Sequence, residues 1–216
     1  IMKRASSARG HLRDKISELI VEFYKIKLET GRKKVREENE QCIHYLMEGS
    51  PKRFCYKDYD RSDPRGYTEV RLLLRGLQQH LFKNHRSLGA EYVRAFKPLP
   101  LPTLALLLTI VRSSTSHTCL DTWATGEFNS QVTFKESEYR PRYKKHLEQL
   151  KQWEEINSVV VQKIREKMFE RIVNMGNLPV QPSNEVDPGG LLQAALKHVQ
   201  EDLACRTGDT DSEDGK

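Results

Sequence analysis

Lysine and arginine are the residues of this 216-residue chain whose spacing points most directly to a chemical role. They gather in three groups along the chain, and their excess over carboxylates leaves a formal net charge of +6. Such side chains neutralise phosphates and release counterions. The second group, over residues 25–36, and the third group, over residues 140–151, therefore indicate a surface for nucleic acid or another acidic partner. The alternative is an ordinary solvated helix face. The candidate binding residues are Lys25, Lys27, Arg32, Lys33, Lys34, Arg36, Arg140, Arg142, Lys144 and Lys145.

Two patterns resemble metal sites but depart from them in detail. The segment 58–69 has carboxylates at the first, third and twelfth positions of a calcium-binding loop. Asp63 stands where the sharp turn requires glycine, and two arginines oppose a cation, so an Asp-Pro turn is the better interpretation. Soft ligands for zinc are present, but their pairs have one intervening residue, which is too close for structural zinc. They are Cys42, His44, Cys55, His117 and Cys119. We therefore predict no metal and no cofactor.

No sequence motif of nucleophilic catalysis is present. The chain lacks Gly-x-Ser-x-Gly, a P-loop, Gly-x-Gly-x-x-Gly and His-Glu-x-x-His. His80, His85, His146 and His198 lie in stretches dense in charge, and we expect them to be surface residues. We assign no catalytic residue and expect that the chain is not an enzyme, although a triad assembled in space stays open.

Apolar residues recur every three or four positions over most of the chain, which predicts an all-α fold. One stripe covers 12–23 and the next 35–47, giving either two helices or one helix kinked near Gly31. Residues 51–66 are rich in Asp, Pro and aromatic side chains and are expected to form a loop. Helices should follow over 68–84, with Thr68 as the N-cap, and over 88–96.

The segment 101–111 is apolar on every side, which predicts a buried central helix around which the other helices form an irregular bundle. Its prolines are compatible with the first turn of a helix. The hydroxyl-rich run that follows weakens the helix, which either breaks there or resumes at 120–123. The longest helix is expected over 138–173, and Pro141 indicates either a kink there or a true start near Glu138. Its aromatic side chains, such as Trp153, should face the core rather than stack on bases.

These elements predict one all-helical domain over residues 10–173, followed by a more polar extension. The extension comprises a linker over 174–190, a short amphipathic helix over 191–205 and a disordered acidic tail over 206–216. No apolar run is long enough to cross a bilayer, so we expect no membrane association. The chain opens without the pattern of a signal peptide, and its four cysteines are irregularly spaced. We therefore expect an intracellular protein of the nucleus or cytoplasm.

Several segments together resemble a known family. They are Phe54-x-Tyr56-x-Asp58, Pro98-Leu99-Pro100-Leu101-Pro102-Thr103-Leu104-Ala105-Leu106, Leu120-Asp121-Thr122-Trp123-Ala124-Thr125-Gly126, Phe134-x-x-x-Glu138-Tyr139-Arg140 and Tyr143-x-x-His146-Leu147. With the basic amphipathic helix before them, they make residues 10–172 similar to a basidiomycete fungal domain family of unknown function. The Leu-Asp-x-Trp-x-Thr-Gly segment and the proline-leucine segment are its most specific parts. The resemblance supplies no catalytic or binding residue.

Taken together, these features predict a non-enzymatic intracellular regulatory or interaction module with a basic face that docks nucleic acid or an acidic protein. One alternative is a helical scaffold for protein–protein interaction, or a homo-oligomer, that uses the helix expected over 138–173. Another alternative is an enzyme of unrecognised type, which requires a concave pocket with converging polar groups.

Overall fold

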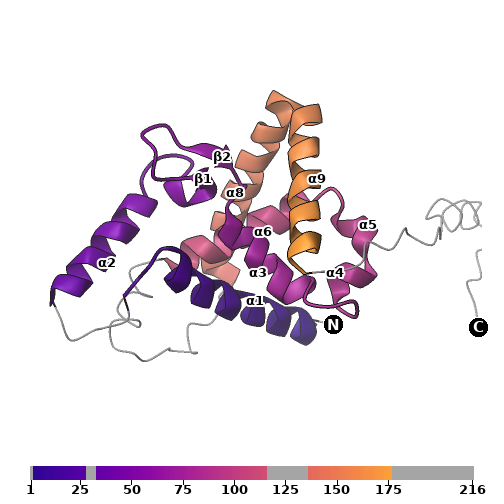
Figure 1. Cartoon of the computed structure of the whole chain (residues 1–216), viewed down its shortest axis with the longest axis horizontal. Coiled ribbons are helices and arrows are strands. Elements are labelled where there is room, and N and C mark those ends of the chain that lie inside the picture. Colours follow the sequence, from indigo (N-terminus) through magenta and orange to yellow (C-terminus); the bar gives the residue numbers. More distant parts are fainter. Residues whose placement is uncertain (1, 28–32, 116–135, 177–216) are drawn as a thin grey trace, which may run out of the picture. The chain divides into compact units, whose positions relative to one another are not determined.

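The apolar repeat folds into α-helices, and the all-α class is confirmed. The computed structural model describes residues 2–27, 33–115 and 136–176, with no account of the side chains of 2–9 and 136, and Figure 1 labels its elements. In chain order these are α1 (Met2–Phe23), α2 (Lys33–Leu46), the 3-10 helix η1 (Arg53–Cys55), β1 (Tyr56–Asp58), β2 (Arg65–Tyr67), α3 (Arg71–Leu81), α4 (Leu88–Glu91), α5 (Val93–Phe96), α6 (Leu101–Ser114), α8 (Glu136–Ile156) and α9 (Ser158–Met175).

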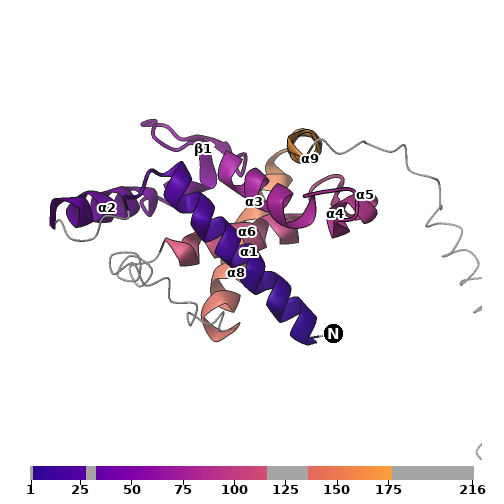
Figure 2. The same cartoon turned by 60° about the horizontal axis from the view of Figure 1, so that its bottom comes forward.

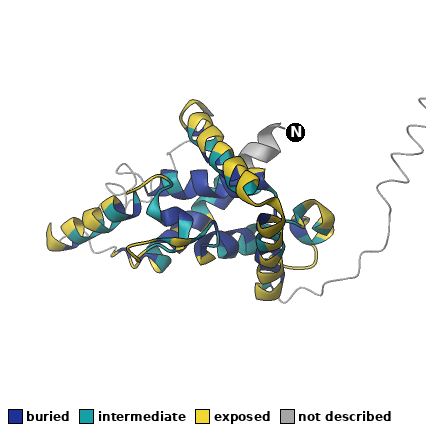
Figure 3. Cartoon of the chain, turned by 90° about the horizontal axis from the view of Figure 1, so that it is seen from above, coloured by how far each residue is buried: buried dark blue, intermediate teal, exposed yellow. Residues whose placement is uncertain are grey.

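Helix α6 lies at the centre of the packing, which confirms the prediction for the segment 101–111. Ten of its 14 residues are buried, and α1, α3 and α8 pack against it (Figure 2). Pro100 occupies the N-cap position and Pro102 the first turn, where a missing N–H costs no intrahelical hydrogen bond. The burial colours of Figure 3 show the same arrangement, with the buried residues concentrated in the central helices.

The hydroxyl residues at the end of α6 continue the helix to Ser114 rather than breaking it. The Thr115 hydroxyl donates to the carbonyl oxygen of Val111 at 2.9 Å, and the Thr109 hydroxyl donates to that of Ala105 at 2.7 Å. The hydroxyls of Ser17 and Ser114 lie 3.0 Å apart and link α1 to α6. These bonds satisfy buried polar groups locally, so the helix tolerates residues that often end helices.

Helices α1 and α3 pack closely because a glycine lies at their contact. The α1 stripe buries Leu12, Ile16, Leu19 and Ile20, as the periodicity predicts. A Cβ atom on Gly76 of α3 would lie 2.9 Å from Cγ1 of Ile16, which is too close for a real contact. The absence of a side chain at this position therefore sets the distance between the two helices.

The segment 51–66 is more ordered than the predicted loop, because it contains η1 and β1 and leads into β2. The two antiparallel strands pair Tyr56 with Tyr67 and Asp58 with Arg65. The paired tyrosine rings lie 5.5 Å apart, a cross-strand aromatic contact that stabilises the hairpin. Strands of three residues are too short for the alternation of polar and apolar residues to reveal them.

Thr68 is not the N-cap of α3, so that prediction is wrong. Its backbone has a φ of 68°, and its N–H donates to the carbonyl oxygen of Cys55 at 2.7 Å. The buried side chain lies against Met168 of α9, with Oγ1 3.8 Å from Sδ. Val70 precedes the helix instead, and its side chain makes no capping bond. Packing against α9 therefore outweighs the capping preference of threonine.

The single long helix expected over 138–173 is wrong, since the segment forms two helices that break at Asn157. The Asn157 side chain accepts a hydrogen bond from the Val160 N–H at 3.1 Å and caps α9. Arg165 of α9 pairs with Glu154 of α8, and its Nε donates to the carbonyl oxygen of Leu99 at 2.7 Å. The break lets α9 pack against both α8 and α3, which a straight helix would prevent.

Other boundaries shift by smaller amounts. The helix expected over 88–96 divides into α4 and α5 at Tyr92, and α1 and α2 are separate helices rather than one kinked helix. Pro141 lies inside α8, which begins at Glu136. Helix α9 continues to Met175, two residues into the predicted linker. The predictions for 116–135, including the helix resumption at 120–123, and for the residues after 176 lie outside the described residues.

Candidate anion-binding site

Basic side chains from two helices meet where the last turn of α6 packs against α8. Arg142 of α8 donates from Nη1 to the hydroxyl of Ser113 at 3.2 Å, which places it beside the end of α6. Arg112 belongs to the last turn of α6, and its charge and that of Lys145 both lower the pKa of His146. Cations at the C-terminal end of a helix are stabilised by the helix dipole. We call Arg112, Arg142 and Lys145 the α6–α8 basic cluster.

His146 follows Lys145 on α8 and is buried, so its predicted surface position is wrong. Its side chain is 2 % exposed, and its ring lies edge-on to Phe54 at 6.2 Å. Within the described residues neither ring nitrogen has a hydrogen-bond partner. Burial lowers the pKa of His146 to about 4, and the charges of Arg112 and Lys145 add to the effect. The imidazole is therefore neutral at pH 7.

The exposed lysines of α8 have no acidic partner among the described residues. Lys144, Lys145 and Lys151 are exposed and form no ion pair there. Arg140 is exposed as well and has an interaction of its own. The first half of α8 therefore presents Lys144 to solvent beside Lys145 of the α6–α8 basic cluster. Their binding role stays a prediction.

The other predicted basic group differs because glutamates of α2 pair with it. Lys27 contacts Glu38 at 2.6 Å, and the Asn39 side chain bonds the backbone N–H and carbonyl oxygen of Lys27. Two further pairs have a spacing of four residues on α2: Lys33 with Glu37 at 3.8 Å and Arg36 with Glu40 at 3.6 Å. These contacts neutralise much of the group locally.

The remaining predicted residues of this group add little to a common site. Lys25, with a φ of 54°, and Lys34 are exposed, while Arg32 lies outside the described residues. Helix α2 packs against η1, whereas α8 packs against α6 and α9, and the two helices lie apart in both Figure 1 and Figure 2. The described contacts therefore do not bring the two basic groups together.

The metal-like patterns have local explanations. In the segment 58–69, Glu69 at the twelfth position pairs with Arg171 of α9 at 3.2 Å, and Asp63 pairs with Arg65 at 3.5 Å. Burial raises the pKa of Cys55 to about 12 and also raises the pKa of Cys42, which keeps both thiols protonated. Within 2–27, 33–115 and 136–176, no three His, Cys, Asp or Glu side chains are grouped so that they could hold a metal.

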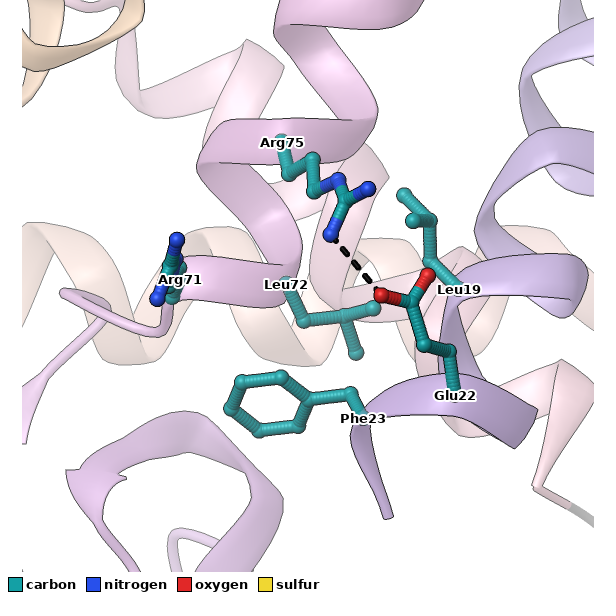
Figure 4. A pocket seen from close by; sticks show the side chains of 6 residues that line it. All are labelled: Leu19, Glu22, Phe23, Arg71, Leu72 and Arg75. Carbon is teal, nitrogen blue, oxygen red and sulfur yellow. Dashed lines mark hydrogen bonds and ion pairs between the residues drawn. The ribbon is translucent and has the colours of Figure 1, made fainter. Parts of the chain in front are cut away.

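A hollow between α1 and α3 was missed by the sequence analysis. It has a volume of about 320 Å³ and is lined by Leu19, Glu22, Phe23, Arg71, Leu72 and Arg75 (Figure 4). The spacing of Arg71 and Arg75, one helical turn apart, was the available signal in the sequence. The contribution of α1 to this hollow depends on how the two helices pack, which the spacing does not reveal.

These features define a helical domain that contains a buried histidine next to basic side chains. The family model of a domain of unknown function, DUF6532, matches residues 1–153, and the chain belongs to this family. The match includes the α6–α8 basic cluster and the hollow, while α9 lies beyond it. No curated protein and no solved structure matches the chain. Among the described helices, none combines the length and apolar character required to span a membrane.

Proposed function

We propose that this chain is a non-enzymatic intracellular regulatory or interaction module that binds an acidic partner through α8 and the end of α6. The position of Arg142 at the end of α6, where it donates to the hydroxyl of Ser113 next to Arg112, is the observation that supports the proposal most. Cations that share one surface raise the local concentration of a polyanion and speed its association. Nucleic acid is the first partner to test, because its regular phosphates match several cations at once.

The basic residues of α8 support this role better than those of α2. Among the described residues, no carboxylate has to leave Lys144 or Lys145 for a phosphate to bind them, whereas Lys33 must leave Glu37. Exposed ion pairs contribute only about 0–1 kcal/mol each, so breaking one pair on α2 costs little. The cost recurs for each paired cation that a phosphate binds. We therefore propose that α2 contributes only a weaker, long-range electrostatic attraction for the acidic partner.

A comparison of two matched lysine pairs tests the proposal. Binding of labelled duplex DNA to the full chain is measured by fluorescence anisotropy between about 50 and 200 mM salt. We expect Lys144→Gln/Lys145→Gln to weaken binding by about tenfold and to reduce the salt slope by about one for each lost contact. Lys33→Gln/Lys34→Gln removes the same charge and should change binding by less than about threefold.

The outcomes separate the parts of the proposal. Equal losses in the two double variants would contradict the assignment to α8. No binding of the wild-type chain at either salt concentration would exclude duplex DNA, and a negative result with poly-glutamate as well would exclude acidic partners in general. Circular dichroism spectra and melting temperatures of both variants establish that each retains its fold.

An interaction scaffold is the second candidate function, and one observation favours it. Apolar side chains at the turn between α8 and α9 face solvent: Ile156 is 83 %, Val159 61 % and Val160 48 % exposed. Exposed apolar side chains that adjoin one another are typical of protein contacts. Light scattering over a concentration series tests self-association, and Ile156→Ser/Val159→Ser should abolish any dimer observed. A strict monomer at all concentrations would exclude the homo-oligomer.

We also propose that the family to which the chain belongs is the basidiomycete fungal family that its sequence resembles. The segments Leu120-Asp121-Thr122-Trp123-Ala124-Thr125-Gly126 and Pro98–Leu106 support this origin. A survey of genomes for chains that carry both segments in this order tests it. Their occurrence mainly outside basidiomycetes would contradict the proposal.

A further inference from the structure

The hollow between α1 and α3 is separate from the α6–α8 basic cluster and combines charge with an apolar floor. Its volume of about 320 Å³ lies at the lower end of the range of small-ligand pockets. A pocket of this size accepts a short side chain or a small molecule. The last two turns of α1 form one wall, and the first two turns of α3 form the other (Figure 4).

The charges that line the hollow leave one positive unit available. Arg75 donates from Nη1 to Oε1 of Glu22 at 3.0 Å, which holds its guanidinium across the hollow. Arg71, one turn earlier on α3, is exposed and has no hydrogen-bond or ion-pair partner among the described residues. A guanidinium has five N–H donors, so Arg75 keeps donors beyond the one that Glu22 uses. Two arginines and one glutamate together suit a single negative charge.

The apolar part of the hollow is fixed by packing. Leu19 and Leu72 are buried and form its floor. The half-buried ring of Phe23 contacts Tyr24 edge-to-face at 5.1 Å and lies 6.4 Å from the ring of Tyr59. These contacts hold the ring in place before any ligand arrives. A wall that is already ordered loses little conformational entropy on binding.

We infer that this hollow binds a monocarboxylate that carries an apolar group. Arg71 pairs with the carboxylate, the donors of Arg75 that Glu22 leaves unused add to the attraction, and the apolar group lies against Phe23 and Leu72. Arginine and carboxylate match in geometry and form charge-assisted hydrogen bonds. A dianionic phosphate fits less well because Glu22 repels its second charge. The same chemistry occurs in a free organic acid and in an Asp or Glu side chain beside an apolar residue of a peptide.

A pair of small probes tests this chemistry on the full chain. The probes are 3-phenylpropionate and its uncharged amide, titrated while protein chemical shifts are recorded by NMR. We expect the acid to bind at least about tenfold more tightly than the amide, because only the acid forms charge-assisted bonds. Equal binding of acid and amide, or tenfold tighter binding of phenyl phosphate, would overturn the inference.

Variants of the lining residues distinguish binding from a structural role. Arg71→Gln should raise the Kd of 3-phenylpropionate by about tenfold, while Arg86→Gln, at an exposed arginine outside the hollow, should change it by less than twofold. Glu22→Gln should tighten binding several-fold, because it removes a carboxylate that competes for Arg75. A purely structural role for Glu22 would leave the Kd unchanged or raise it, which would contradict the inference.

The two sources of the ligand are separated by a second pair of probes. Acetyl-Asp-Phe-amide is compared with acetyl-Asn-Phe-amide and with 3-phenylpropionate. Tighter binding of the Asp peptide than of the small acid assigns the hollow to a polypeptide ligand, and the reverse order assigns it to a free acid. Because Lys144 and Lys145 do not line the hollow, their double variant should bind all these probes as the wild type does. A loss in that variant would overturn the independence of the two sites.

Discussion

Helices α2 and α6 each contain 14 residues, but they occupy opposite environments. Ten of the 14 residues of α6 are buried, including Leu104, Leu107 and Leu108, whereas α2 buries only Val35, Ile43 and Leu46. The yellow outer part of α2 and the blue centre of Figure 3 show this contrast. Helix length and periodicity therefore do not decide where a helix lies. The width of its apolar surface does.

The same contrast applies to the basic residues near each helix. On α2 the cations find glutamates four residues away on the same helix, so local sequence determines their partners. At the end of α6 the cations come from two helices that meet only in the folded chain. Stability should therefore respond strongly to changes at the α6–α8 contact and weakly to changes on α2.

The largest effect is expected from the protonation of His146. Its pKa is about 4 in the folded chain and near 6.5 when unfolded, so the unfolded chain binds more protons between these pH values. The free energy of unfolding should be fully retained above pH 6.5 and should fall by about 3 kcal/mol as the pH decreases to 4. Urea unfolding at pH 7.5, 5.5 and 4.5 measures this loss.

Two variants isolate the contribution of His146. His146→Leu should flatten the dependence on pH, and at pH 7.5 its stability should equal or exceed that of the wild type, because two unpartnered nitrogens are removed. His44→Gln, at an exposed histidine of α2, should keep the wild-type dependence. An unchanged pH dependence in His146→Leu would contradict the buried neutral imidazole.

A matched pair of valines gives the next largest effect. Val111 of α6 is fully buried in the core cluster, while Val35 of α2 is buried at 9 % exposure and lies outside that cluster. Val111→Ala should lower the free energy of unfolding by about 2–3 kcal/mol, and Val35→Ala by less than about 1 kcal/mol. Equal losses in urea unfolding would remove the distinction between the two helices.

A smaller effect is expected at the break between α8 and α9. Asn157→Ala removes the cap of α9 and should cost about 1 kcal/mol of stability. Asn157→Asp keeps an oxygen acceptor at the same position and should be close to the wild type. Thermal unfolding of both variants measures the difference. If the alanine variant is as stable as the wild type, packing alone positions the break.

The smallest effect is expected from the ion pairs of α2. Glu37→Gln and Glu40→Gln each remove one exposed pair and should change stability by less than about 0.5 kcal/mol. Melting curves at low and high salt measure this change. If these glutamates mask the α2 cations, the double variant should also bind duplex DNA more tightly than the wild type. Unchanged DNA binding would show that α2 takes no part in attracting the ligand.

Much of the fold could be predicted from periodicity, and the failures have physical causes. Ile156, Val159 and Val160 continue the spacing of an apolar stripe, so the sequence predicts one helix where the chain turns at Asn157. The exposure of these side chains follows from the turn and not from their type. Thr68 has the character of a cap but lies in the core, because α9 packs over it.

The candidate site was predictable only in part. The cations of α8 are visible in the sequence, but Arg112 is separated from them by a long stretch of chain. Only the packing of α6 against α8 brings Arg112 near them. Charged neighbours made His146 resemble a surface residue, since the 3.6-residue period of a helix places exposed residues directly before and after a buried one. The ion pairs of α2 that involve Glu37 and Glu40 could be predicted from their four-residue spacing, because an isolated helix already brings such residues together.

The sequence alone determined the helical class and the burial of the segment 101–111, because local periodicity and continuous apolar composition act within one element. Only the tertiary structure decided which charges share a surface, which histidine is withdrawn from water and where two arginines face a glutamate across a hollow. These features join residues from different helices, such as Arg112 with Lys145 and Arg75 with Glu22. Their proximity depends on how the helices pack, which no single stretch of sequence specifies.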